Sequence, residues 1–327
     1  MKLFTSYLRL IRPVNLFMIA FTLYMVRFAF ILPLLNFSNF PLQVKETVFA
    51  LFALAFIFIA AGGYIINDYY DMTIDKVNKP DKVIIGNTIS PKTALRSYYI
   101  FTLFGLACGF WSCYKAGAPL LELLFVFYAI ALWFYSYKLK STFLLGNTLI
   151  AIFLGLVPLA SAYIEVQADL NNPESPDTIL DASRMGAWSI ALFAFIITLI
   201  REIVKDVEDT EGDQLANCRT LPIVWGIKKS KITVLSLLIL MMVLLAAFQY
   251  YAWGMGWHPT VYFLLLLVQL PCLIILWKIR KASTPKEFHG ISNWLKIVMI
   301  TGICYLFVFA YESYITLQII RKFMHNL

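Results

Sequence analysis

Long runs of apolar residues alternate with short polar loops along nearly the whole chain. Nine runs are long enough to cross about 30 Å of hydrocarbon, because a helix rises about 1.5 Å per residue. They lie at residues 13–35, 47–67, 93–114, 119–137, 142–164, 185–204, 232–253, 259–279 and 294–318. One of them contains Gly105 and Gly109, a GxxxG spacing that permits close helix packing. The pattern predicts an all-α, polytopic membrane protein with a bundle of nine transmembrane helices.

The composition supports this fold class. Of 327 residues, 61% are hydrophobic and 14% are charged, whereas a soluble domain has roughly 45–50% and about 25%. The first apolar run is too long for a signal-peptide core of ~7–15 residues and is interpreted as the first membrane helix. The five cysteines form no CxxC pair and the three histidines no cluster, so neither zinc chemistry nor a histidine general base is expected.

The distribution of lysine and arginine predicts the orientation. With the N-terminus in the cytoplasm, 21 of the 27 basic residues lie on the cytoplasmic side and 5 on the opposite side, with Arg27 inside the first helix. Such a bias is typical of cytoplasmic loops, so the net charge of +8 is no sign of nucleic-acid binding. Arg27 is expected to snorkel to the outer surface. The acidic outer loop 165–184 is expected to be a solvated insert without chemistry.

The most informative polar residues form a carboxylate pattern that occurs twice. Each set has aspartates at i, i+3 and i+7, which on one helix would share a face. The first set is Asp68, Asp71 and Asp75, and the second is Asp206, Asp209 and Asp213. The offset of 138 residues is the same for all three pairs. Both sets follow apolar runs that end on the cytoplasmic side, which indicates an internal pseudo-repeat.

Such clusters are costly unless a cation lies among them, because like charges repel. Mg²⁺ prefers oxygen ligands and commonly takes one or two carboxylates plus substrate phosphates. Lysine and arginine near each set would bind the remaining phosphate oxygens. We therefore expect a metal site that binds a diphosphate and makes it a better leaving group. The alternative interpretation is that the aspartates are solvated helix-end charges.

These segments resemble those of the UbiA superfamily of intramembrane prenyltransferases. The match is carried by NDYYDMTIDKVNKP (67–80), REIVKDVEDTEGD (201–213) and RTLP (219–222), with support from IRPVN (11–15) and YSYKLK (135–140). It implies one prenyltransferase domain over 1–327, with nine helices and Asp-rich cytoplasmic motifs at 67–82 and 201–222. The stretch from Arg201 to Asp209 is most similar to members that prenylate geranylgeranylglyceryl phosphate.

The resemblance also implies residue roles. Mg²⁺ held by the six aspartates would bind an allylic polyprenyl diphosphate, whose ionisation gives an allylic cation that the acceptor attacks at C1. The implied catalytic residues are Asp68, Asp71, Asp206, Asp209 and Lys140. The implied substrate-binding residues are Asn67, Lys79, Lys82 and Arg219. From the sequence itself, Arg201 and Lys205 are candidates for binding a phosphorylated acceptor, Tyr137 is a further substrate-binding candidate, and Asn15 either faces the cavity or is a helix-packing polar residue. One departure is Lys82-Val83, which stands where many members have Arg-Pro. This departure leaves the identity of the basic phosphate contact open.

Two further polar features have alternative interpretations. Tyr135 and Tyr137 would stabilise a cation through their rings, or they belong to an interfacial aromatic belt. Glu202, one turn before Asp206, is expected to pair with Arg201, Lys205 or the acceptor site.

The function predicted from these observations is Mg²⁺-dependent prenyl transfer in the cell (inner) membrane, with the active site facing the cytoplasm. The preferred acceptor is a polyprenylglyceryl phosphate hydroxyl, which gives an ether lipid. An aromatic acceptor, as in quinone or haem biosynthesis, is the alternative. A divalent-cation transporter is the alternative of another class, although transport sites usually lie near the membrane midplane. The expected partners are the two substrates and the bilayer, without nucleic acid or an obligate protein partner.

Overall fold

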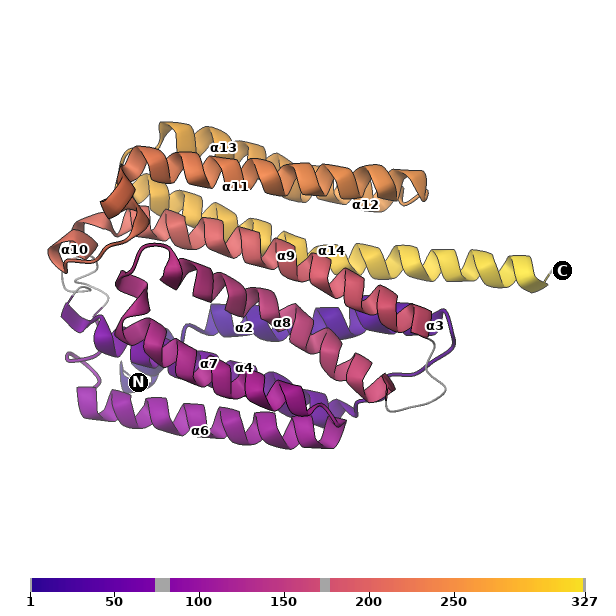
Figure 1. Ribbon diagram of the computed structural model, residues 1–327, viewed down its shortest axis with the longest axis horizontal. Coiled ribbons are helices and arrows are strands. Elements are labelled where there is room, and N and C mark those ends of the chain that lie inside the picture. The colour runs from indigo at the N-terminus through magenta and orange to yellow at the C-terminus, as the bar shows by residue number, and fades with distance from the viewer. Residues whose placement is uncertain (1, 74–82, 171–176, 326–327) are drawn as a thin grey trace.

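The computed structural model describes residues 2–73, 83–170 and 177–325, and these form an almost entirely helical bundle (Figure 1). The first half contains α1 (Lys2–Ile11), α2 (Pro13–Met25), the π-helix η1 (Val26–Ile31), α3 (Leu32–Asn36), α4 (Glu46–Tyr70), α6 (Pro91–Ala116), α7 (Pro119–Tyr137), the short 3-10 helix η3 (Leu139–Ser141) and α8 (Leu145–Leu170). The second half contains α9 (Asp177–Glu208), α10 (Thr210–Leu215), α11 (Leu221–Gly254), α12 (His258–Leu264), the π-helix η4 (Leu265–Gln269), α13 (Leu270–Lys281) and α14 (Pro285–His325).

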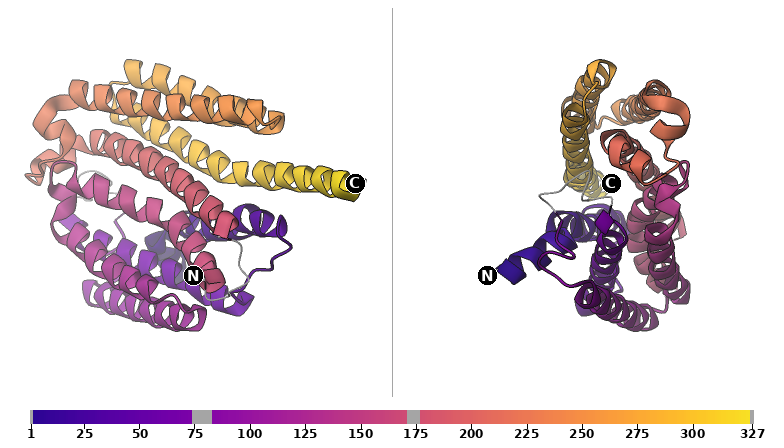
Figure 2. Two further views of the ribbon diagram at one scale, coloured as in Figure 1. Left: turned by 45° about the vertical axis from the view of Figure 1, so that its right-hand side comes forward. Right: turned by 90° about the vertical axis from the view of Figure 1, so that its left-hand side faces the viewer.

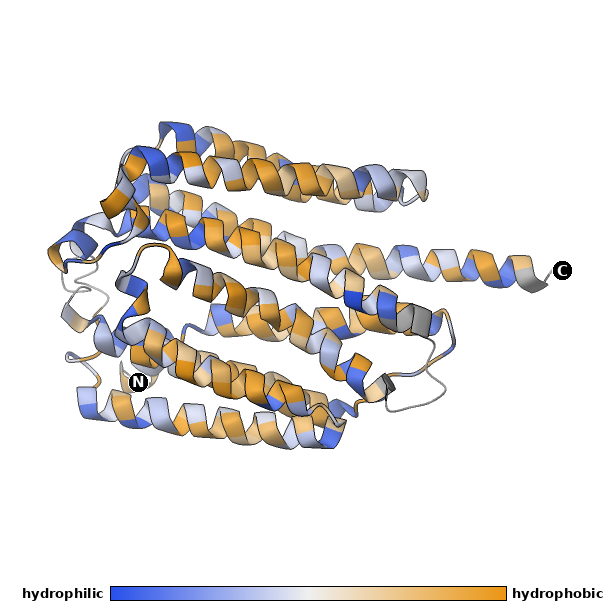
Figure 3. Cartoon of the chain, viewed as in Figure 1, coloured by the Kyte–Doolittle hydropathy of each residue, from blue (hydrophilic) through white to orange (hydrophobic). Residues whose placement is uncertain are grey.

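The long helices lie roughly parallel or antiparallel along one axis (Figures 1 and 2). The N-terminus lies toward one end of the bundle, and α14 carries the C-terminus out at the other. The C-terminal ends of α4, α7 and α9 lie at the same end of the bundle, which is also where α10 lies. Apolar residues dominate the middle of the helices and polar residues gather toward their ends (Figure 3), as a membrane-spanning bundle requires.

Eight helical segments within the described residues are long and apolar enough to cross a membrane. They correspond to eight of the nine expected runs, so the protein is a multi-pass integral membrane protein. The expected run at 93–114 is helical as part of α6, but α6 is not among the eight. The two glycines of the predicted GxxxG pack closely against two helices, Gly105 against α4 and Gly109 against α7. A Cβ at Gly105 would lie 2.6 Å from Ile59 Cγ1, and one at Gly109 would lie 2.5 Å from the ring of Phe125.

Two large apolar cores divide the bundle along the sequence. One joins α2, α4, α6, α7 and α8 and is rich in aromatic residues, including Phe52, Phe56 and Phe125. The other joins α9, α11, α13 and α14 and consists mainly of aliphatic side chains. Packing of α8 directly against α9 connects the halves. Each half thus has its own core, and the surfaces that face each other between them are free to line a cavity.

The aspartate motifs lie where helices end, as predicted, but the second one is not a single helix face. Helix α4 ends at Tyr70, so Asp71 caps its C-terminus. Helix α9 ends at Glu208, and Asp209 precedes α10, which turns away from the bundle axis. The expectation of one continuous face over all three aspartates is therefore wrong for the second set, because the chain changes direction at Asp209.

The end of the bundle opposite α10 corrects two further expectations. The Arg27 side chain is 3% exposed and does not snorkel. Its Nε lies 3.1 Å from Glu165 Oε1 and its Nη1 lies 3.3 Å from Glu46 Oε2, while Nη2 donates to the Val44 carbonyl. Glu165 belongs to α8 and is fully buried. The acidic stretch 165–184 therefore begins with a buried carboxylate, not with a solvated one. Glu165 is the ion-pair partner of Arg27, and an unpaired Arg27 in this interior would cost far more free energy than the pair.

Candidate active site

A cavity of about 710 Å³ lies between the two halves and extends along much of the bundle. Most of its wall is aliphatic or aromatic. Its charged lining residues, together with several polar ones, gather near the C-terminal ends of α4 and α9. They are Arg12, Asn15, Tyr64, Asn67, Tyr135, Arg201, Glu202, Lys205 and Lys296. The cavity therefore has one charged end, and its remaining length suits a hydrocarbon chain.

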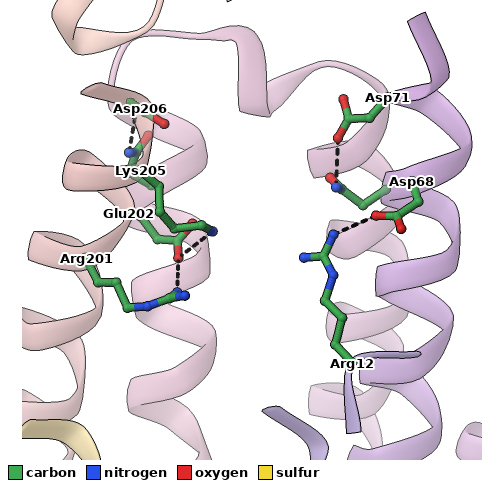
Figure 4. A network of polar contacts seen from close by, with 9 residues as sticks. Arg12, Asp68, Asp71, Arg201, Glu202, Lys205 and Asp206 are labelled. Carbon is green, nitrogen blue, oxygen red and sulfur yellow. Dashed lines mark hydrogen bonds and ion pairs between the residues drawn. The ribbon is translucent and has the colours of Figure 1, made fainter. Parts of the chain in front are cut away.

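The first motif contributes one side of this charged end (Figure 4). Arg12 precedes α2 in a left-handed conformation (φ 53°) and donates from Nη2 to Asp68 Oδ1 at 2.6 Å. Asp71 accepts from Asn67 Nδ2 at 2.8 Å and contacts Lys140 Nζ from η3. Each carboxylate thus has a cationic partner from another segment.

The second motif contributes the facing side (Figure 4). Glu202 is buried and accepts from both neighbouring cations, at 3.0 Å from Arg201 Nη1 and at 2.9 and 3.0 Å from Lys205 Nζ. Asp206 accepts from Asn147 Nδ2 of α8 at 2.8 Å. Residues 201, 202, 205 and 206 share one face of α9, because helical residues four apart lie above one another. Their side chains point into the space between α9 and α4.

The remaining predicted residues lie around this end or outside the described chain. Asp213 lies in α10 and is half-buried, as is Asp209. Arg219 is exposed, and its backbone N–H donates to the Ser141 carbonyl at 2.8 Å, which brings its loop next to η3. Asp75, Lys79 and Lys82 fall outside the described residues.

The two predicted tyrosines have different surroundings. Tyr135 lines the cavity. Tyr137 is 56% exposed and stacks on Trp133 with ring centroids 5.4 Å apart, and it does not belong to the cavity wall. Helical geometry explains the difference, because residues two apart lie on opposite sides of a helix.

The structure adds site residues that the motifs did not identify. Arg12 pairs with Asp68 and lies over the Tyr64 ring at 4.9 Å. Asn147 binds Asp206, and Lys296 reaches the same cavity from α14. The signal for Arg12 was present in the segment IRPVN. Asn147 and Lys296 carry no local signal, because only the packing of α8 and α14 brings them to the site.

The surroundings of Arg12 favour its charged form. Burial opposes the charge on Arg12, but its pKa is raised overall because Asp68, Tyr64 and Asp71 lie close to the guanidinium. The surroundings of Cys218, near the second motif, instead disfavour its charged form, the thiolate. Burial is the largest effect and raises the pKa of its thiol, and Asp213 adds to that shift. The thiol therefore stays protonated at neutral pH.

The donor set suits a hard divalent cation. Among the described residues no three Asp, Glu, His or Cys side chains already form a metal site. Mg²⁺ does not require three, because it commonly binds one or two carboxylates together with substrate phosphates. Asp68, Asp71 and Asp206 provide carboxylates from facing helices. Asn67 Oδ1 is buried and has no hydrogen-bond partner among the described residues, so it offers a further neutral oxygen ligand.

Fold and site together define an intramembrane protein that can hold an anion and a hydrocarbon tail in one cavity. The model of the UbiA prenyltransferase family matches residues 28–300. The chain therefore belongs to the UbiA prenyltransferase family and is a prenyltransferase. This membership removes the basis for interpreting the chain as a cation transporter.

Similar proteins agree with this assignment. The digeranylgeranylglyceryl phosphate synthase of Saccharolobus solfataricus is 32% identical over 267 residues, which cover 81% of this chain and 85% of that protein. The synthase of the same name from Methanosphaera stadtmanae is 30% identical over 246 residues, covering 75% and 81%. The structure of a UbiA homolog from Archaeoglobus fulgidus bound to GPP and Mg²⁺ has a TM-score of 0.55 at 20% identity, covering 92% of this chain and 99% of that one. It shares the fold.

Proposed function

We propose that this prenyltransferase transfers a prenyl group from an allylic polyprenyl diphosphate to the hydroxyl of a polyprenylglyceryl phosphate, forming an ether lipid in a Mg²⁺-dependent reaction. The observation that carries the proposal is the single cavity whose basic and acidic residues gather at one end, with a long apolar wall beyond them. The names of the similar synthases support the acceptor.

The donor diphosphate belongs at the Asp68–Asp71 side of the cavity. Mg²⁺ would be held by Asp68, Asp71, Asp206 and Asp209, with Asp75 and Asp213 as further ligands. When bound, it would neutralise the diphosphate and stabilise it as a leaving group. Lys140, which contacts Asp71, would exchange that carboxylate for a phosphate oxygen. Asn67, Arg219, Lys79 and Lys82 complete the proposed diphosphate contacts.

The acceptor phosphate belongs at the facing side. Arg201 and Lys205 currently share the Glu202 carboxylate, and Arg201 Nε is buried without a hydrogen-bond partner among the described residues. Lys296 adds a third cation from α14. A phosphate monoester would replace part of the Glu202 contacts and satisfy the unpaired Nε. The carboxylate of an aromatic acid would offer this group of cations one negative charge, whereas a phosphate monoester offers up to two and more oxygen acceptors.

Residues between the two phosphate sites would shape the reaction. The C1–O bond of the donor would break, with the diphosphate leaving with the bonding electron pair. The acceptor oxygen would then bond to the allylic C1, and its hydroxyl proton would pass to the released diphosphate. The rings of Tyr64 and Tyr135 line this part of the cavity and would stabilise positive charge at C1. The apolar wall would limit the entry of water, which would otherwise hydrolyse the allylic cation. Asn15 would orient the acceptor.

We also propose that residues 1–327 form a single protein domain embedded in the cell membrane, with α6 as its ninth membrane span. The charged end of the cavity would face the cytoplasm. Residues 97–114 of α6 contain no charged residue, and their serine, threonine, glycine, tyrosine and tryptophan residues lower the mean hydropathy. The bias of lysine and arginine toward this side supports the orientation.

A transfer assay tests the function. Purified protein in liposomes would receive Mg²⁺, a labelled C20 allylic diphosphate, and either geranylgeranylglyceryl phosphate or a 4-hydroxybenzoate acceptor. We expect label in the phosphorylated lipid, lost in Asp206→Asn and retained in Asp181→Asn, an exposed position at the outer end of α9. Label moving into the aromatic acceptor instead would overturn the proposed acceptor.

A further inference from the structure

Three aromatic side chains line the end of the cavity farthest from the charged residues. Phe30 belongs to η1, Phe309 to α14, and Trp257 to the turn before α12. The Phe30 and Phe309 rings have centroids 5.2 Å apart, and Phe309 and Trp257 have centroids 5.7 Å apart. The three rings therefore form a continuous aromatic floor, which we define as Phe30, Trp257 and Phe309.

A glycine brings the floor into contact with α9. A Cβ built at Gly186 would lie 2.2 Å from Phe30 Cζ, a separation that atoms do not adopt. The absence of a side chain at Gly186 therefore lets the Phe30 ring lie directly against the α9 backbone. This contact leaves little room for a hydrocarbon chain to pass between η1 and α9.

Each floor residue lies three positions from a buried polar residue that binds another segment. Arg27, three residues before Phe30, pairs with Glu165 of α8. Thr260, three residues after Trp257, donates from its backbone N–H to Glu312 at 3.2 Å, and Glu312 follows Phe309 by three residues. Interior charges and their partners adopt few alternative arrangements, because separating them is costly. These contacts therefore hold the floor on the side of η1 and on the side of α12 and α14.

The distance from the charged end to the floor matches a particular class of tail. Arg201 lies across the charged end from Asp68 and the donor side, so it marks the same end of the cavity. Arg201 and Gly186 both line the cavity and lie 15 positions apart on α9, about 22 Å at ~1.5 Å per residue. An extended chain advances about 1.2 Å per bond, by the geometry that gives a polypeptide roughly 3.5 Å for three bonds. Four isoprene units, with 16 main-chain carbons, therefore take about 19 Å. A fifth unit would meet the floor.

We propose that the aromatic floor of Phe30, Trp257 and Phe309 is the length-determining element for the donor tail and admits about four isoprene units. This inference rests on the proposed function, in that the donor tail is taken to occupy the cavity. Shorter tails would leave part of the apolar wall in contact with no chain. Longer tails would have to displace rings that are held by the buried polar contacts.

Binding and turnover with a series of tails test the floor separately from the function. Thiolodiphosphate analogues with C15, C20, C25 and C30 tails, which resist ionisation, would be added to the full protein, and thermal stabilisation would be measured. The matching allylic diphosphates would be used for transfer. The variants are Phe30→Ala and Phe309→Ala, with Phe307→Ala as the matched control. Phe307 is on the same helix as Phe309, is 57% exposed, and is outside the cavity wall.

We expect the wild type and Phe307→Ala to prefer C20 in both assays. In Phe30→Ala or Phe309→Ala, the C25 to C20 ratio of affinities should rise about tenfold, because the extra unit gains apolar burial. An unchanged ratio in both floor variants, with C20 binding retained, would overturn the inference. A changed binding ratio without transfer by the wild type would uphold the floor and reject the proposed function.

Discussion

Replacing Lys205 by methionine would test the acceptor-phosphate site while keeping most of the side chain's length and apolar stem. In the free protein, Lys205 Nζ lies 2.9 and 3.0 Å from the Glu202 oxygens. A hydrogen bond to a charged group contributes about 1.5–3 kcal/mol. The side chain is 32% exposed, so solvent screening favours the lower half of this range. We expect kcat/KM for a phosphorylated acceptor to fall about 10- to 40-fold, since 1.4 kcal/mol is tenfold.

The assay compares two acceptors that differ only in the phosphate, geranylgeranylglyceryl phosphate and geranylgeranylglycerol. Lys205→Met should impair the first and leave the second nearly unchanged, and KM for the donor should stay constant. Lys228→Met removes an exposed charge on the same side of the bundle and controls for loss of net charge. Equal impairment with both acceptors would refute an acceptor-phosphate role for Lys205. It would instead indicate a defect in the donor site or in folding.

Three further predictions concern stability and reactivity. Arg27→Met leaves Glu165 buried without its cation, so it should destabilise the protein by about 3–5 kcal/mol; a melting temperature equal to the wild type would contradict this. Gly105→Leu should lower stability by about 1–3 kcal/mol through overpacking against Ile59, and unchanged thermal unfolding would argue against the close α4–α6 contact. The raised pKa of the Cys218 thiol means less thiolate below pH 9, so its alkylation by iodoacetamide should be slower than that of a model thiol and increase as pH rises. Alkylation of Cys218 as fast as the model thiol at pH 7 would show that its pKa is not raised.

The sequence predicted the membrane bundle because hydrocarbon-length apolar runs have few other stable structures. The acidic motifs indicated the position of the site, because their charges follow apolar runs that end on the same side. Glu202 was expected to pair with Arg201 or Lys205, and the structure confirms both contacts.

Other features depend on contacts between distant segments. Asn147 and Lys296 have no motif around them and reach the site only because α8 and α14 pack against the helices that carry the motifs. Arg27 was expected at the surface, since a lone arginine near a helix end commonly snorkels. Its buried partner Glu165 is 138 residues away. Nothing in the local sequence links the two residues.

Product identification tests the proposed function most directly. Wild-type protein in liposomes would receive Mg²⁺, a C20 allylic diphosphate and geranylgeranylglyceryl phosphate, and the lipids would be analysed by mass spectrometry with released diphosphate measured in parallel. We predict a phosphorylated diether that carries two C20 chains, formed in a one-to-one ratio with diphosphate. Release of diphosphate with free prenyl alcohol and no diether would contradict prenyl transfer to this acceptor.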